Sequence, residues 1–436
     1  MTDDTERRTP ARPLAHHRAE AAPAPSFVAA FEVPAFRWVW TAALSGNSGR
    51  FAVLLVAGWE AYRLGNHSSI WPSLVSFLLL VPMTVFGLPA GGLADRVNRA
   101  QQAGLGQALN ALTCAAGGAL ALTGHLGLDG VLAVTALVGL GNSVQAPAWQ
   151  SLVPALVGPE RMVNAGAVTR IAQQGAELTG PAIGTAVLTT LGPGPVFFLC
   201  AAFYLAGAAM FGHVRHASPP GIPASGLGWW AHLGEGVSYV GRRRPLSTLL
   251  SWVGLHCGLT MASIGILPAV ASANLHGDAS AYGLLLSFFG AGSIAGPLLL
   301  MALRRQDRPA LLLALSGVAS GAALVGLGLA HSPVAAAAWA LLAGAGQSVF
   351  MALIYSSTMT VAENRLRGRV SSIQLTLTTG LMGTASLGWG ALVFVLAPGL
   401  VLALPGVVFV AACAPFIARA GALNHGIAAV SATGGK

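Results

Sequence analysis

A short charged turn between two long uncharged runs constrains the fold of this chain more than any other feature of its sequence. The runs span about residues 70–93 and 103–124, and the turn GGLADRVNR covers residues 91–99. Each run is long enough to cross the hydrocarbon core of a bilayer as a helix. Asp95, Arg96 and Arg99 cannot lie in hydrocarbon, because burying unpaired charge is costly. The turn is therefore expected at a membrane surface, on the side richer in basic residues.

The composition extends this interpretation to the whole chain. Hydrophobic residues make up 54% of the 436 residues and charged residues only 8%, against roughly 25% charged in soluble domains. The four cysteines lie in apolar runs without CxxC spacing, so we expect neither a disulfide nor a metal site. We expect an all-α integral membrane protein of twelve helices, near residues 36–59, 70–93, 103–124, 130–156, 163–190, 194–213, 246–273, 280–303, 309–330, 333–360, 368–392 and 397–418.

Basic residues indicate the orientation of this layout. Of the 23 arginines and lysines, all but Arg50, Arg63 and Arg170 fall on the side of the two termini. Because positive residues are retained on the cytoplasmic side, both termini are expected in the cytoplasm. This topology also accounts for the net charge of +9, so nucleic acid is not an expected partner.

The longest internal connection divides the chain into two halves. GLGNSV at residues 139–144 recurs as GAGQSV at residues 344–349, an offset of 205. The recurrence supports two parallel six-helix repeats, with a substrate cavity between them near the middle of the bilayer. The expected segments are a disordered cytoplasmic tail (1–34), the first half (35–213), a cytoplasmic linker (214–245), the second half (246–419) and a cytoplasmic tail (420–436).

The charged turn resembles motif A of the major facilitator superfamily, Gly-x-Leu-Ala-Asp-Arg-x-Gly-Arg, which joins helices 2 and 3. Gly91, Asp95, Arg96 and Arg99 match, together with the Leu and Ala between them. Asn98 stands where the family usually has Gly, and Asn is the residue next best suited to a left-handed backbone. The resemblance implies the major facilitator fold and a gate in which Asp95 contacts the other half of the protein.

Four further segments resemble the bacterial secretion-effector branch of that superfamily. They are QAPAWQSLVPALVGPERMVNAGAV after helix 4, GPAIG in helix 5, EGVSYVGRRRPL before helix 7 and RLRGRV before helix 11, within a resemblance that covers about residues 36–418. The branch includes exporters of enterobactin and of antibiotics. It implies a proton-driven exporter of a small molecule in a bacterial-type inner membrane, with the proton gradient in place of any cofactor. We expect it to function as a monomer in the lipid bilayer.

Gly180, Pro181 and Gly184 resemble motif C, the antiporter signature of helix 5, although Thr185 replaces a usual Gly. Pro181 permits a kink because it removes a backbone hydrogen bond, and the glycines allow helices to approach closely. Such packing is expected to block proton leakage along the interface between the halves. Ordinary helix packing is the alternative.

Three charged residues lie within expected membrane helices. A charge near a helix centre is expensive in lipid and therefore faces protein or water. Arg50 is in helix 1, whereas Arg170 and Glu177 share a face of helix 5 about 10 Å apart along its axis, so each needs a partner elsewhere. Two interpretations stay open: a structural salt bridge, or proton coupling at Glu177 assisted by the arginines.

Two other titratable groups have competing interpretations. Glu60 closes helix 1 with Arg63 one turn later, which predicts an i, i+3 pair at the outer surface or a proton entry group. His256 in helix 7 is either a hydrogen-bonded structural residue or a coupling group, because an unperturbed histidine titrates near neutral pH.

The candidate substrate contacts are polar and aromatic residues at cavity depth. Because few of them carry fixed charge, we expect a bulky, apolar or amphipathic substrate held by a few hydrogen bonds. The sequence contains no nucleotide-binding or hydrolase motif, so an enzyme is not expected. A nutrient importer or facilitator, and a non-transporting membrane sensor or assembly protein without a cavity, remain alternatives. The candidates are Asn47, Asn142, Gln145, Trp149, Gln173, Gln174, Trp252, Gln347, Tyr355, Gln374 and Trp389.

Overall fold

The described part of the chain folds entirely into helices and the short turns between them. The structure is a computed structural model, and it describes residues 29–94, 97–218, 234, 238–302, 309–363 and 366–433. The principal helices are α1 (Pro34–Leu64), α2 (Ile70–Ala94), α3 (Arg99–Leu122), α4 (Leu128–Leu191), α5 (Pro193–Val214), α7 (Arg244–His256), α8 (Leu267–Leu275), α9 (Ala279–Ala302), α10 (Pro309–Gly328), α11 (Pro333–Val361), α12 (Arg367–Leu392) and α13 (Pro398–Thr433).

Nine helical segments of the described chain are long and apolar enough to cross a membrane. They are the segments Ile70–Gly87, Arg99–Leu122, Leu128–Gly158, Pro193–Val214, Arg244–Leu275, Ala279–Ala302, Ala310–Gly328, Pro333–Val361 and Pro398–Pro415. Three further long helical stretches are more polar: α1, the second part of α4, and α12. The first two carry Arg50, Arg170 and Glu177. These charged residues lower the mean hydropathy of two of the expected membrane spans.

The expected helices at 130–156 and 163–190 are joined in one element, α4, which bends at Gly158. Gly158 has φ 73° and ψ 170°, a conformation that glycine adopts readily because it lacks a Cβ atom. The ends of the chain also differ from expectation. Residues 29–32 of the expected disordered tail form a short 3₁₀ helix packed on α4, and α13 continues through the expected C-terminal tail to Thr433. Residues 1–28 and most of the linker lie outside the described residues.

Helix 7, expected as one helix over 246–273, is interrupted in its middle. Between α7 and α8 the backbone passes through a π-helical turn (Cys257–Met261) and a 3₁₀ turn (Ala262–Ile266). The Gly258 carbonyl in this stretch accepts a hydrogen bond of 2.8 Å from the Trp389 indole of α12. Single π turns inside helices frequently mark functional sites.

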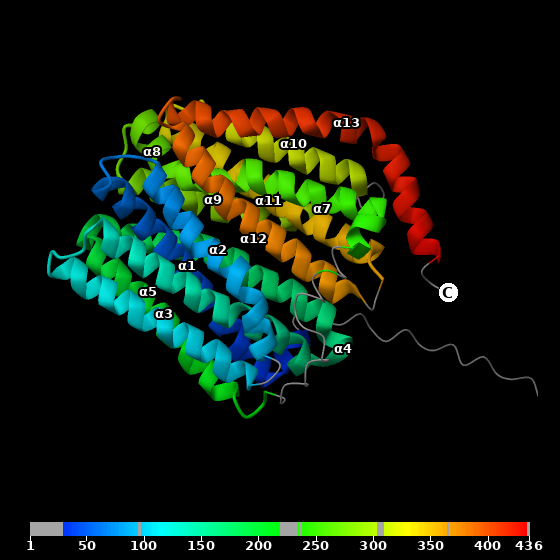
Figure 1. The fold of residues 1–436 in the computed structure, drawn as a ribbon, viewed down its shortest axis with the longest axis horizontal. Coiled ribbons are helices and arrows are strands. Elements are labelled where there is room, and N and C mark those ends of the chain that lie inside the picture. Colours follow the sequence, from blue (N-terminus) through cyan, green and yellow to red (C-terminus); the bar gives the residue numbers. More distant parts are fainter. Residues whose placement is uncertain are drawn as a thin grey trace, which may run out of the picture.

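The helices form two groups that lie side by side, α1–α5 and α7–α13 (Figure 1). The groups meet along two helix pairs, α2 with α12 and α4 with α9. At the first pair, the Ser386 hydroxyl donates to the Ser73 carbonyl at 2.9 Å, and the hydroxyl oxygens of Thr84 and Thr379 are 2.8 Å apart. Polar contacts and close backbone approach therefore hold the halves together along these pairs.

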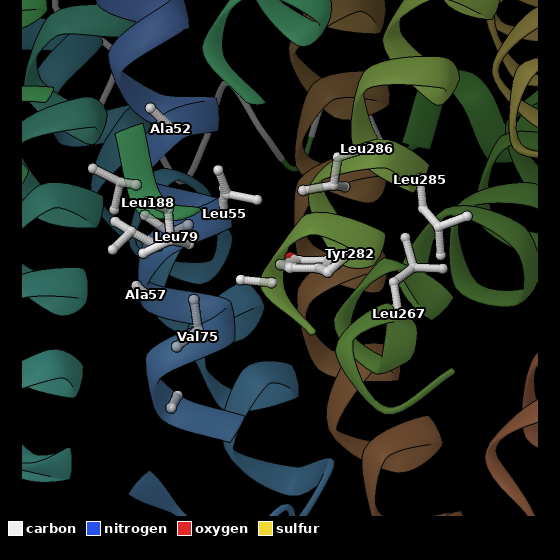
Figure 2. Packing of buried hydrophobic residues seen from close by; sticks show 14 of the residues in the cluster. Ala52, Leu55, Ala57, Val75, Leu79, Leu188, Leu267, Tyr282, Leu285 and Leu286 are labelled. Atoms are coloured by element: carbon white, nitrogen blue, oxygen red, sulfur yellow. The ribbon is translucent and has the colours of Figure 1, made fainter. Parts of the chain in front are cut away.

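One apolar cluster spans both halves and closes one end of their interface. Leu55 and Val75 of the first half face Tyr282 and Leu286 of the second half, and all four are buried (Figure 2). At the end near the termini, the described apolar residues instead form two separate clusters, one within each half. Among the described residues, the buried apolar cluster that the halves share therefore lies at the end away from the termini.

Candidate functional site

A central cavity of about 410 Å³ lies between the two halves and is lined by residues of both. Its walls come from helices on each side of the interface, including the interrupted middle of helix 7. The expected candidates Asn47, Asn142, Gln145, Trp149 and Gln347 line it, as do Gln173 and Gln174. A cavity of this size accepts a ligand of drug-like dimensions.

All charged residues of the described cavity wall belong to the first half: Arg50, Arg170 and Glu177. Among the described residues none forms a direct ion pair with Glu177. The Ser293 hydroxyl of α9 lies near its carboxylate and donates to the Gly290 carbonyl at 2.9 Å. Both arginines are close enough to Glu177 to act on it through charge. These residues therefore do not form a simple salt bridge. Three charged side chains line the cavity without direct ion pairs among them.

The two arginines have different contacts. The Arg50 guanidinium lies over the Phe51 ring, 4.4 Å from its centroid. Arg170 donates to Gln173 at 3.3 Å and lies 5.8 Å from the ring centroid of Tyr355 on α11 of the other half. Arg170 and Glu177 thus both reach a partner on another helix, as their spacing on α4 predicted.

Side-chain amides are concentrated on the wall formed by the first half. Inside this wall, Asn142 Oδ1 accepts hydrogen bonds from Asn110 at 3.0 Å and from Gln145 at 2.6 Å. The wall is therefore partly fixed by its own network. Seven of the eight amides that line the described cavity are on this side: Asn47, Gln107, Asn142, Gln145, Gln150, Gln173 and Gln174, with Gln347 opposite.

The wall formed by the second half carries hydroxyl groups and methionines instead of charges. Thr260 and Ser263 from the interrupted helix 7 line the cavity, together with Met261, Met351 and Met382. Methionine side chains are flexible and polarisable, so they adapt to ligands of different shape. Sequence reasoning missed these methionines because nothing in their spacing separates a cavity wall from an ordinary apolar core.

The two glycines of motif C, Gly180 and Gly184, pack against α1 within the first half. A Cβ atom on Gly180 would lie 2.5 Å from the Ser48 carbonyl oxygen, and one on Gly184 would lie 2.9 Å from the Leu55 side chain, both on α1. The adjacent Ser48 and Thr179 hydroxyl oxygens are 2.8 Å apart. Gly180 and Gly184 therefore join α4 to α1, in agreement with the alternative of ordinary helix packing, and the expected block of proton leakage stays a prediction.

Only part of the motif A turn is described. Gly91 lies in the last part of α2, Arg99 begins α3 and donates to the Ser151 carbonyl at 3.4 Å, and Asp95 and Arg96 lie outside the described residues. Asn98 has φ −65° and not the expected left-handed conformation. It caps α3, because its side-chain oxygen accepts from the Gln101 amide at 3.1 Å.

Two titratable candidates lie away from the cavity. Glu60 is buried at the closed end and pairs with Arg63 at 2.5 Å, as the i, i+3 spacing predicted. His256 is enclosed within the second half, where its ring stacks on Phe350 at 4.1 Å and its Nε2 lies 3.3 Å from the Ser320 hydroxyl. These contacts favour the structural interpretation of His256.

Four of the aromatic and polar candidates do not line the described cavity. Trp252 contacts Phe409 edge-on, and Gln374 is buried without reaching the cavity. Trp389 donates its hydrogen bond to the interrupted helix 7. Tyr355 is exposed beside Arg170. Hydropathy predicts depth along a membrane helix, but it does not predict which face of an apolar helix turns toward the cavity.

Comparison with known proteins defines the class to which this fold and cavity belong. The family model of the transmembrane secretion effectors matches residues 25–429. The chain therefore belongs to the transmembrane secretion effector family of the major facilitator superfamily. It is a multi-pass membrane transporter and not an enzyme.

A curated relative and two solved structures agree with this assignment. The chain is 28% identical over 365 residues to the enterobactin exporter EntS of Citrobacter koseri, covering 81% of this chain and 85% of the relative. It is similar in fold to a POT family transporter in complex with 5-aminolevulinic acid, with a TM-score of 0.67, 12% identity and coverage of 89% and 96%. It is also similar to a bacterial homologue of the human lysosomal transporter Spinster in an inward-facing, unoccupied conformation, with a TM-score of 0.64, 15% identity and coverage of 92% and 98%.

Proposed function

We propose that this protein is a proton-driven exporter of a small amphipathic molecule, such as a siderophore, antibiotic or drug. The observation that carries the proposal is a cavity between the two halves whose described wall carries one carboxylate, that of Glu177, together with Arg50 and Arg170. A carboxylate in such a cavity can bind and release a proton as the cavity changes sides. The similarity to an enterobactin exporter supports outward transport.

The proposed mechanism is alternating access by two halves of six membrane-spanning helices each. In this proposal the twelve spans are the nine apolar segments together with α1, the second part of α4 and α12, and both termini lie in the cytoplasm of a bacterial-type cell. The shared cluster around Tyr282 then seals the outer end, and the separate clusters near the termini correspond to the inner, open end. A rocking motion of the two halves would open the outer end and close the inner end. Asp95 is the proposed contact of the inner gate, and the proposed unit is a monomer.

The cavity itself weighs against a non-transporting sensor with a closed, dry interface. The direction of transport distinguishes an exporter from the alternative, an importer. We would add a fluorescent amphipathic dye to the outside of membrane vesicles of known orientation and impose a pH gradient. The proposal predicts accumulation in inverted vesicles with an acidic lumen, and loss of accumulation when nigericin collapses the gradient. Accumulation in right-side-out vesicles alone would identify an importer and refute the proposal.

A further inference from the structure

The cavity is polarised between its two walls, and this polarity bears on the substrate. All three charges and seven of the eight amides of the described wall belong to the first half, whereas three of the four methionines belong to the second half. A ligand that is uniformly apolar would leave the amides without partners. A ligand that is uniformly polar would gain nothing from the methionine wall.

We infer that the substrate is an amphipathic molecule with an uncharged, hydrogen-bonding head held by the first half and an apolar body held by the methionine wall of the second half. This inference rests on the proposed transport function and adds the substrate class and its orientation. Head groups of this kind contain amide, hydroxyl or ester functions, which donate and accept hydrogen bonds without carrying charge.

The charges of the wall argue against a charged head. Arg50 and Arg170 oppose a cationic head, and the carboxylate of Glu177 opposes an anionic one. A neutral head can interact with both kinds of group, because it accepts hydrogen bonds from a guanidinium and donates one to a carboxylate. Protonation of Glu177 replaces a charged acceptor by a neutral carboxyl group, which is a weaker acceptor, so release of the substrate and uptake of a proton are compatible.

The amides provide the matching groups, since each side-chain amide both donates and accepts. Some are engaged within the protein: Asn142 and Gln145 bond to each other, and the Asn47 amide donates to the Ala43 carbonyl at 2.8 Å. Gln150 and Gln174 line the cavity without a hydrogen bond to any described residue. These two are the amides most available to a substrate head.

The methionine wall suits a body of variable shape. Met261 lies in the interrupted stretch of helix 7, and Met351 and Met382 project from α11 and α12. Three flexible side chains from three elements can adjust to one apolar group without a fixed pocket. Specificity is therefore expected to come from the head, with the body adding affinity in proportion to the apolar area that it buries.

Two panels of synthetic probes test the inference with the purified full chain in lipid nanodiscs. The first has one dansyl-alkyl body and three heads: carboxamide, carboxylate and trimethylammonium. The second keeps the carboxamide head and lengthens the alkyl chain. We expect the carboxamide probe to bind at least about tenfold more tightly than either charged probe, measured by fluorescence anisotropy, and affinity to rise with chain length.

A reciprocal exchange of side chains tests the orientation. Gln174→Met should weaken binding of the carboxamide probe about tenfold. The increase in affinity with alkyl chain length should remain. Met351→Gln should retain the preference for the carboxamide and reduce the gain from chain length. Met162→Gln, at an exposed position of α4 outside the cavity wall, is the matched control and should change neither.

The outcomes separate this inference from the proposed function. Dye export with tightest binding of a charged head would overturn the uncharged head and leave export standing. Equal effects of Gln174→Met and Met351→Gln on both panels would overturn the orientation. Failure of every probe to bind, together with absence of dye transport, would overturn both proposals.

Discussion

Gly290 of α9 lies directly against the backbone of Glu177 of α4, on the opposite half of the protein. A Cβ atom at position 290 would come within 2.4 Å of the Glu177 carbonyl carbon and oxygen. About two turns further along α4, a Cβ atom at Gly283 of α9 would lie 1.8 Å from the Thr185 hydroxyl oxygen. The close approach of α9 to the α4 backbone at Glu177 therefore requires a residue without a side chain at position 290.

We predict that Gly290→Val prevents this close approach and reduces transport severely, because the added side chain has no space beside the α4 backbone. Overpacking of this kind typically costs about 1–3 kcal/mol. The measurement is dye transport in proteoliposomes together with the melting temperature of the purified protein. Gly166→Ala is the control, since a Cβ atom there meets nothing within 4 Å. Normal transport by Gly290→Val would contradict the tight α4–α9 contact.

A second prediction concerns the closed end of the cavity. Tyr282 is 1% exposed, its hydroxyl lies 3.5 Å from the Leu54 carbonyl oxygen, and its ring lies near Trp59. Tyr282→Ala should open this end by removing a large buried side chain that lies between the halves. A cysteine placed at the cavity residue Ser76 should then react with an impermeant thiol reagent added on the side away from the termini.

The four native cysteines are buried and give a low background for this labelling. Ser76→Cys alone should react slowly from that side. Equal labelling with and without Tyr282→Ala would show that Tyr282 does not seal the cavity.

A third prediction concerns the start of α9. The Asp278 carboxylate accepts hydrogen bonds from the Ser280 amide at 2.8 Å and the Ser280 hydroxyl at 2.6 Å. The hydroxyl bond, followed by the backbone bond, holds the pKa of Asp278 below its ordinary value of 3.8. Asp278→Ala should therefore destabilise the protein by about 0.5–1 kcal/mol at neutral pH, the usual cost of losing such a cap.

The sign of the pH dependence follows from the lowered pKa. The stabilisation by the charged form is present above pH 3.8 and is lost as the pH falls through the lower pKa of the folded protein. The difference in melting temperature between the wild type and Asp278→Ala should therefore shrink in acid. Asp278→Asn, which can still cap the helix, is the control. A difference that grows in acid would contradict this assignment.

The sequence predicted the helical class, most helix positions and the two groups of helices, because apolar length and charge placement are strong constraints in a membrane. The interruption of helix 7 could not be predicted in this way. Its freed Gly258 carbonyl is satisfied by Trp389, a residue 131 positions later in the chain. Asn98 is a second example. Its identity predicted a left-handed backbone, whereas in the structure its side chain accepts a hydrogen bond from Gln101 and caps α3.

The sequence predicted several of the residues that line the cavity, but it did not predict which groups surround them. Arg50, Arg170 and Glu177 stood out because charge is rare in apolar helices, and all three line the cavity. His256 stood out for the same reason but lies within an aromatic cluster. A single helix sequence does not determine which neighbour surrounds a polar side chain, so the partner Ser293 and the methionine wall emerged only from the packing of the two halves.

The measurement that tests the account most directly is transport by Glu177→Gln in proteoliposomes. The account predicts that this variant no longer moves dye against its gradient when a pH gradient is imposed, while probe binding and downhill exchange persist, because the amide keeps the hydrogen bonds but cannot exchange a proton. Glu160→Gln, which removes an exposed carboxylate from the same helix, should transport normally. Uphill, pH-driven transport by Glu177→Gln at the wild-type rate would contradict the central claim that Glu177 couples protons to export.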